Sequence, residues 1–72
     1  MEKAGYDVIL QSVGRRKMEV IQEVRAATGL GLAEAVKLVD SSPVLLKSGM
    51  SQEAAERVQR ALARVGATVE IL

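Results

Sequence analysis

The hydrophobic pattern of the chain begins and ends with a two-residue period. Residues 6–11 alternate, with Tyr6, Val8 and Leu10 on one side, and residues 68–72 alternate in the same way at the C-terminus. A two-residue period places successive side chains on opposite faces of a strand. Both ends of the chain are therefore predicted to be half-buried strands.

Three segments between these strands repeat apolar residues every three or four positions, which is the pattern of an amphipathic helix. They cover residues 16–28, 32–41 and 52–65. Gly29 and Gly66 follow the first and third segments, and glycine readily takes the left-handed conformation that ends a helix. The residues expected on the buried stripes are Val20, Ile21, Val24, Ala27, Leu32, Ala35, Leu38, Val39, Ala54, Ala55, Val58, Ala61, Leu62 and Val65.

A further strand is predicted between the second and third helices. Residues 41–43 end the second helix, because their proline cannot continue it. Residues 44–47 are mainly apolar but too few for a helix, so we expect a brief edge strand there, with Gly49 turning the chain. Ser51 then stands where a side-chain oxygen can cap the third helix.

The predicted elements follow in the order β-α-α-β-α-β within 72 residues. Three strands and three amphipathic helices in so short a chain indicate one two-layer α+β domain, with helices on one face of a small sheet. The core is expected to consist of Val, Leu, Ile and Ala side chains, with Tyr6 as the only aromatic ring available.

Composition excludes most kinds of chemistry. The chain has no Cys and no His, so it lacks thiolate metal ligands and the commonest general base. A single aromatic residue and a net charge of +1 argue against base stacking and against a general attraction to nucleic acid or lipid. No apolar run approaches the roughly 18 residues of a membrane span. We expect a cytoplasmic binding domain, not an enzyme, with no cofactor, no metal, and no direct contact with nucleic acid or membrane.

The run from Val20 to Ala35 carries the most specific signal, VIQEVRAATGLGLAEA. It resembles the C-terminal domain of the bacterial large-subunit ribosomal stalk protein, and the resemblance extends without a gap over about residues 2–72. It implies three helices layered on a three-stranded antiparallel sheet. It also implies a function, because in this family the domain recruits translational GTPases, such as elongation factors Tu and G, to the large ribosomal subunit.

The resemblance further implies a protein-binding face on the first two helices and the glycine-rich turn between them. The positions that match the family's contact surface are Lys17, Val20, Ile21, Arg25, Gly29, Leu30, Gly31, Leu32 and Glu34. Three more residues belong to this face but differ from the family. Met18 stands where valine is common, and Gln22 and Val36 stand where lysine is usual.

Two further departures leave a second interpretation open. Ala33 replaces another of the family's lysines, and the charge of +1 contrasts with a family domain that is typically acidic. The family's N-terminal dimerisation domain and hinge have no counterpart in these 72 residues, so we expect either an excised domain or a free-standing relative, monomeric or weakly dimeric. The alternative function is a free-standing interaction module with the same fold and a different protein partner.

Two charged stretches allow more than one interpretation. Arg15, Arg16 and Lys17 stand at the start of the first predicted helix, where each cation opposes the helix dipole by about 0.3–1 kcal/mol. They are either part of a solvated loop or a docking point for an acidic partner.

The third predicted helix carries the other charged stretch. Glu53 and Arg57, and likewise Glu56 and Arg60, have the i,i+4 spacing of ion pairs. Such pairs would neutralise two members of a basic row that Arg64 completes, so this row is predicted to be a solvated face rather than an RNA contact.

Met18 and Val36 do not fit the apolar stripes of their helices. If both lie near the turn at residues 29–31, they form a small apolar patch with a basic surround, which is the composition of a modest protein-docking site. The surrounding residues would be Lys17, Arg25 and Lys37.

Overall fold

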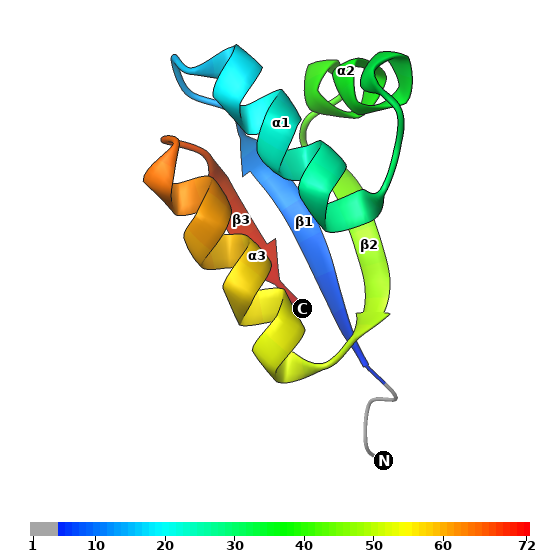
Figure 1. Ribbon diagram of the computed structural model, residues 1–72. Coiled ribbons are helices and arrows are strands. Elements are labelled where there is room, and N and C mark those ends of the chain that lie inside the picture. The colour runs from blue at the N-terminus through cyan, green and yellow to red at the C-terminus, as the bar shows by residue number, and fades with distance from the viewer. Residues whose placement is uncertain (1–4) are drawn as a thin grey trace.

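The computed structural model describes residues 5–72, and its six elements follow in the predicted order (Figure 1). The elements are β1 (Tyr6–Ser12), α1 (Lys17–Thr28), α2 (Leu32–Asp40), β2 (Val44–Met50), α3 (Gln52–Arg64) and β3 (Thr68–Ile71). The predicted α+β class is confirmed. Each helix begins and ends within a residue of its predicted limits, because the apolar stripes and the flanking glycines and serine mark both ends.

The sheet has the strand order β2-β1-β3, and both pairings are antiparallel. The first strand of the chain is therefore the central one, and the last strand pairs along one of its sides. Asp7 and Leu72 exchange two backbone hydrogen bonds of 2.9 Å each, which ties the end of the chain to β1. Both β2 and β3 are left as outer strands.

The helices form a second layer over one face of this sheet. Figure 1 shows α1 between the other two helices. On one side α3 lies over β3, and on the other side α2 packs against α1 near the start of β2. The core between the layers is aliphatic, as predicted. Its members are Val8, Leu10, Val20, Ile21, Val24, Ala35, Val39, Leu46, Ala55, Leu62, Ala67 and Val69.

Two apolar residues that the pattern assigns to the core lie outside it. Leu32 is 52% exposed because it is the first residue of α2, where the chain has just left the connecting turn. The buried contacts of α2 are made one and two turns later, by Ala35 and Val39. Tyr6 is 36% exposed at the start of β1, so the core contains no aromatic ring.

The strand β2 differs most from its prediction. It runs to Met50, so Gly49 lies inside the strand and does not turn the chain. Two irregularities in its pairing with β1 explain the extra length, because β2 uses one more residue than β1 at each of them. Gly49 has a φ of +68°, a conformation that suits glycine at such a bulge.

The predicted helix ends are confirmed. The Ser51 hydroxyl accepts a hydrogen bond of 3.1 Å from the Ala54 N–H and so caps α3. Gly29 takes the left-handed conformation after α1 and donates its N–H to the Arg25 carbonyl at 2.8 Å. The start of α1 differs, because its N-cap residue Arg16 makes no side-chain capping bond.

Candidate functional site

The predicted protein-binding face lies on a helical hairpin made by α1, the turn at residues 29–31, and α2. At its open end Lys17, the first residue of α1, forms an ion pair with Asp40, the last residue of α2. The ion pair joins α1 and α2 at one end of the hairpin, and the short turn joins them at the other end. The two helices therefore present one continuous surface.

The part of this surface nearest the turn gathers several predicted residues. Gln22, Arg25, Gly29 and Leu30 line a shallow hollow of about 330 Å³ together with Ala26. Gln22 and Arg25 share a face of α1 because three residues separate them, close to one helical turn. The sequence pattern brought these side chains to one face, and the turn then places Leu30 beside them.

Leu32 extends the apolar part of this surface onto α2. Its side chain is 52% exposed, whereas Leu30 is half-buried at the turn itself. Glu34 is exposed two residues later. A large exposed leucine next to charged neighbours is the arrangement of a protein-docking surface, with an apolar centre and a polar rim.

Gly31 lies between these leucines with open space around it. Its φ of −71° is available to any residue, and a Cβ atom added there would meet no atom within 4 Å. The fold therefore does not require glycine at this position. An open backbone at the middle of the turn is consistent with close approach by a partner.

Three predicted site residues lie partly or wholly in the core. Val20 is completely buried and Ile21 is 2% exposed, so the prediction that they belong to the contact surface is wrong for direct contact. Their burial instead fixes the position of α1 against the sheet. Val36 is half-buried and packs against the core. The resemblance assigned all three by position along the chain, which does not distinguish the inner from the outer side of a helix.

The apolar patch predicted near the turn is also corrected. Met18 lies eleven residues before Gly29, which is about 16 Å along a helix with a rise of 1.5 Å per residue. Its side chain is 63% exposed, but it lies at the end of the hairpin that the Lys17–Asp40 ion pair closes. The exposed apolar residue near the turn is Leu32.

The cations of this face differ in their surroundings. Lys17 is paired with Asp40, and Arg16 lies 3.9 Å from Glu19, so both positive charges are partly neutralised. Within residues 5–72, Arg25 has no carboxylate at ion-pair distance. Arg25 is therefore the predicted contact cation that keeps its full charge for a partner.

The ion pairs predicted on α3 do not form. Glu56 instead accepts a hydrogen bond of 3.4 Å from the Gln52 amide, and no carboxylate in the described part of the chain pairs with Arg57 or Arg60. All the side chains involved are exposed or half-buried. Exposed i,i+4 pairs gain too little energy to fix two long side chains in one geometry.

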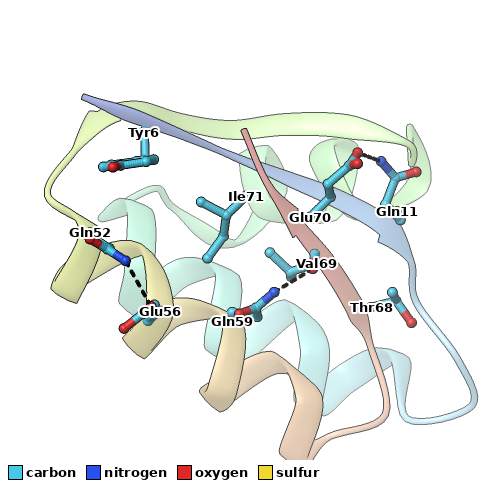
Figure 2. Close-up of a pocket in the computed structure, with 9 residues that line it drawn as sticks. All are labelled: Tyr6, Gln11, Gln52, Glu56, Gln59, Thr68, Val69, Glu70 and Ile71. Atoms are coloured by element: carbon cyan, nitrogen blue, oxygen red, sulfur yellow. Dashed lines mark hydrogen bonds between the residues drawn. The ribbon is translucent and has the colours of Figure 1, made fainter. Parts of the chain in front are cut away.

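Another hollow lies away from the hairpin, between α3 and β3, and measures about 730 Å³ (Figure 2). Its polar side chains are mostly bonded to neighbours. Gln59 donates to the Val69 carbonyl at 2.9 Å, and Gln11 donates to Glu70 at 2.7 Å. The first bond occupies a backbone carbonyl on the outer strand, which hinders another strand from pairing there. Sequence reasoning did not identify this role of Gln59, because it depends on two elements that meet only in the fold.

Among residues 5–72 there is no cluster of three acidic residues that could hold a metal ion. None of the helices in the described range is long and apolar enough to cross a membrane.

Comparison with known proteins identifies the family of this chain. The family model of the ribosomal protein L7/L12 C-terminal domain matches residues 6–72. The large ribosomal subunit protein bL12 of Rubrobacter xylanophilus is 54% identical over 70 residues, which are 97% of this chain and 55% of that protein. The protein of the same name from Desulfotalea psychrophila is 53% identical over 97% of this chain and 57% of its own length.

The chain thus spans little more than half the length of the curated relatives that it matches. The match nevertheless includes every helix and strand of the structure, from β1 to β3. This chain belongs to the family of ribosomal protein L7/L12 C-terminal domains.

Proposed function

We propose that this domain recruits translational GTPases, such as elongation factors Tu and G, to the large ribosomal subunit. The contact would be made by the turn at residues 29–31 with the exposed sides of α1 and α2. The observation that carries the proposal is the hollow that Arg25 and Leu30 share at an open glycine turn, with the exposed Leu32 two residues further along, in a chain of the L7/L12 family. The domain would act by binding alone, and the GTPase would supply the active site.

The chemistry of this cluster supports a contact with a protein. Complete burial of a fully exposed leucine is worth about 1.5–3 kcal/mol, and Leu32 is 52% exposed, so a partner that covers it would gain about half of that. Leu32 is therefore suited to be the apolar anchor. Among the described residues Arg25 has no ion-pair partner, and it lines the hollow at the turn together with Leu30. A cation at the rim of an interface accelerates association with an acidic surface.

Two substitutions test this proposal. Arg25→Glu should weaken binding to elongation factor G at least tenfold and make it less sensitive to salt, and Leu32→Ala should weaken it several-fold at any salt concentration. Binding is measured by titration calorimetry with the purified factor. The control is Lys47→Glu, which makes the same change of charge on the exposed part of β2.

Unchanged affinity in both variants would contradict the proposal. Lys17 is a poorer site for the test, since a glutamate there would also repel Asp40, its partner in the ion pair. Circular dichroism on each variant separates loss of binding from loss of fold.

The alternative is a free-standing interaction module with a different protein partner. Its support comes from Gln22 and Ala33, which are exposed and uncharged where the family usually has lysines. The loss of two positive charges from the exposed hairpin changes which acidic surfaces it attracts. Capture from the extract of the source cell distinguishes the two functions, because recovery of translation factors alone would contradict the alternative.

A further inference from the structure

Two loops that are far apart in sequence meet at one end of the molecule. One connects β1 to α1 and the other connects α3 to β3, and both lie on the same side in Figure 1. Their contact is close, because a Cβ atom added to Gly14 would lie only 2.5 Å from the carbonyl oxygen of Gly66. This contact brings the basic start of α1 next to the basic end of α3.

Three arginines surround a hollow of about 370 Å³ at this junction, namely Arg15, Arg16 and Arg64. All three are exposed. The outer face of α3 continues the positive charge, since Arg60 lies one turn before Arg64 and Arg57 nearly one turn before Arg60. We call these five arginines the arginine end.

Negative charge near the arginine end is found on the side of Arg57 and Arg60, because Glu23 lines a hollow with Arg57, and Glu53 and Glu56 precede Arg57 and Arg60 by one helical turn. Close ion pairs are nevertheless few. In the part of the chain that the structure describes, its one ion pair is the exposed Arg16–Glu19 contact at 3.9 Å. The two pairs that the sequence pattern predicts on α3 are absent. Surface pairs of this kind contribute little even where they form.

Local stability does not explain this arrangement. Arg64 is favourably placed in the last turn of α3, where the helix dipole is negative. Arg15 and Arg16 instead precede α1, where the dipole is positive and opposes them. The fold thus places two cations that the helix dipole disfavours beside a third, so an anion bound between them would be stabilising.

The chemistry of the arginine end fits phosphate groups. The planar guanidinium group presents two parallel donors to a phosphate, and arginine is the residue preferred for nucleic-acid backbones. None of the large exposed apolar residues lines the hollow between these arginines, although Met18 follows Arg16 by two residues, so the hollow itself offers no apolar anchor to a protein partner. No aromatic ring lies there for base stacking, so only the phosphate backbone can be recognised.

We propose that the arginine end binds the phosphate backbone of RNA, independently of base sequence. The expectation of no nucleic-acid contact rested on the net charge of +1, which averages over surfaces of different sign. The family is ribosomal, so an RNA-rich particle is the setting in which such a surface would act. The proposal does not depend on GTPase recruitment, because Arg25 and Leu32 lie on the other part of α1 and on α2.

The test compares two double variants with equal net charge. Arg60→Glu with Arg64→Glu removes two cations from the arginine end, and Lys37→Glu with Lys47→Glu makes the same change of charge elsewhere on the exposed surface. The probe is a fluorescein-labelled RNA stem-loop, and binding is followed by anisotropy between 50 and 200 mM KCl, about the range over which phosphate contacts weaken. The arginine double variant should bind at least tenfold more weakly, and its dependence of log K on log salt should fall by about two units, one for each arginine replaced.

Equal effects of the two double variants would overturn the proposal, because binding would then follow net charge alone. Polyglutamate that displaces the RNA as well as unlabelled RNA does would also overturn it, in favour of an acidic protein partner. Equal affinities for oligo(U) and oligo(A) would support recognition of the backbone. Elongation factor G should bind the arginine double variant as it binds the unaltered chain, so failure of this proposal and failure of the GTPase proposal are distinguishable.

Discussion

The hairpin turn and the arginine end are opposite kinds of surface on one small domain. The surface around the turn at residues 29–31 presents the exposed Leu32, an open glycine and the charge of Arg25, which has no ion-pair partner among the described residues. The arginine end presents five cations, three of them around a hollow that no large exposed apolar side chain lines. A net charge of +1 describes neither surface. The comparison shows that the location of a charge, and whether it has a partner, matter more for binding than the total charge does.

The largest expected effect separates a leucine of the core from the leucine of the turn. Leu62 is completely buried, so Leu62→Ala should lower the free energy of unfolding by about 2–5 kcal/mol and weaken both surfaces together. Leu32→Ala removes the same atoms from a side chain that is 52% exposed, so it should cost less than about 1 kcal/mol. Urea denaturation measures both. A large loss of stability in Leu32→Ala would mean that Leu32 supports the fold rather than a partner.

The next prediction compares a glycine that the fold requires, Gly14 in the loop between β1 and α1, with one that it does not require, Gly31 in the turn between α1 and α2. Gly14→Ala should destabilise the domain by at least about 1–3 kcal/mol, because φ is +78° and the new methyl group would collide with the Gly66 carbonyl. It should also weaken RNA binding, since the junction holds Arg15 beside Arg64. Gly31→Ala should stay within about 0.5 kcal/mol, as the loss of a fair N-cap and the lower entropy of the unfolded chain oppose each other. Thermal unfolding and the two binding assays check this contrast.

A smaller effect of opposite sign tests why Arg16 is present. Arg16→Ser removes a cation from the positive end of α1 and supplies a capping hydroxyl, so it should stabilise the domain by about 0.5–1 kcal/mol. The same variant should bind RNA more weakly. Ser51→Ala is the matched control, because it removes the existing cap of α3 and should cost about 1 kcal/mol without affecting RNA. Lower stability in Arg16→Ser would show that the arginine supports the fold.

The smallest expected effect concerns the ion pair that closes the hairpin. Asp40→Asn leaves Lys17 unpaired and should cost about 0.2–1 kcal/mol, because both side chains are about half exposed. The difference should vanish in 1 M NaCl, where the Debye length is about 3 Å. Denaturation at low and high salt measures it. A salt-independent loss would point to a packing role for Asp40 instead.

Much of the fold could be predicted from the sequence, for local reasons. The stripe of α1 and the capping serine of α3 act within a few residues, so periodicity and capping rules find them. Leu32 shows where such rules fail, because the pattern places it on the buried stripe, but α2 makes its buried contacts only one and two turns later, at Ala35 and Val39. The prediction that Gly49 turns the chain was wrong for a related reason, because the position of a bulge depends on the partner strand β1 as well as on β2.

The candidate site was predictable to a smaller extent. The family resemblance identified the hairpin, and the structure gathers Gln22, Arg25 and Leu30 there. The resemblance could not separate the buried Val20 and Ile21 from the exposed site residues on either side of them, nor place Met18 away from the turn. Each of these depends on which side of a helix faces the core.

The sequence by itself determined the order of elements, the α+β class and the family of this protein, because periodicity, caps and residue matches are properties of neighbouring positions. Only the tertiary structure decided which charges remain unpaired and which surfaces they form. Arg15 and Arg64 are 49 positions apart in the chain, and they become neighbours because Gly14 packs against Gly66. Contacts between residues so far apart in the sequence form only when the helices pack on the sheet around a common core, so they cannot be predicted from the pattern of neighbouring residues.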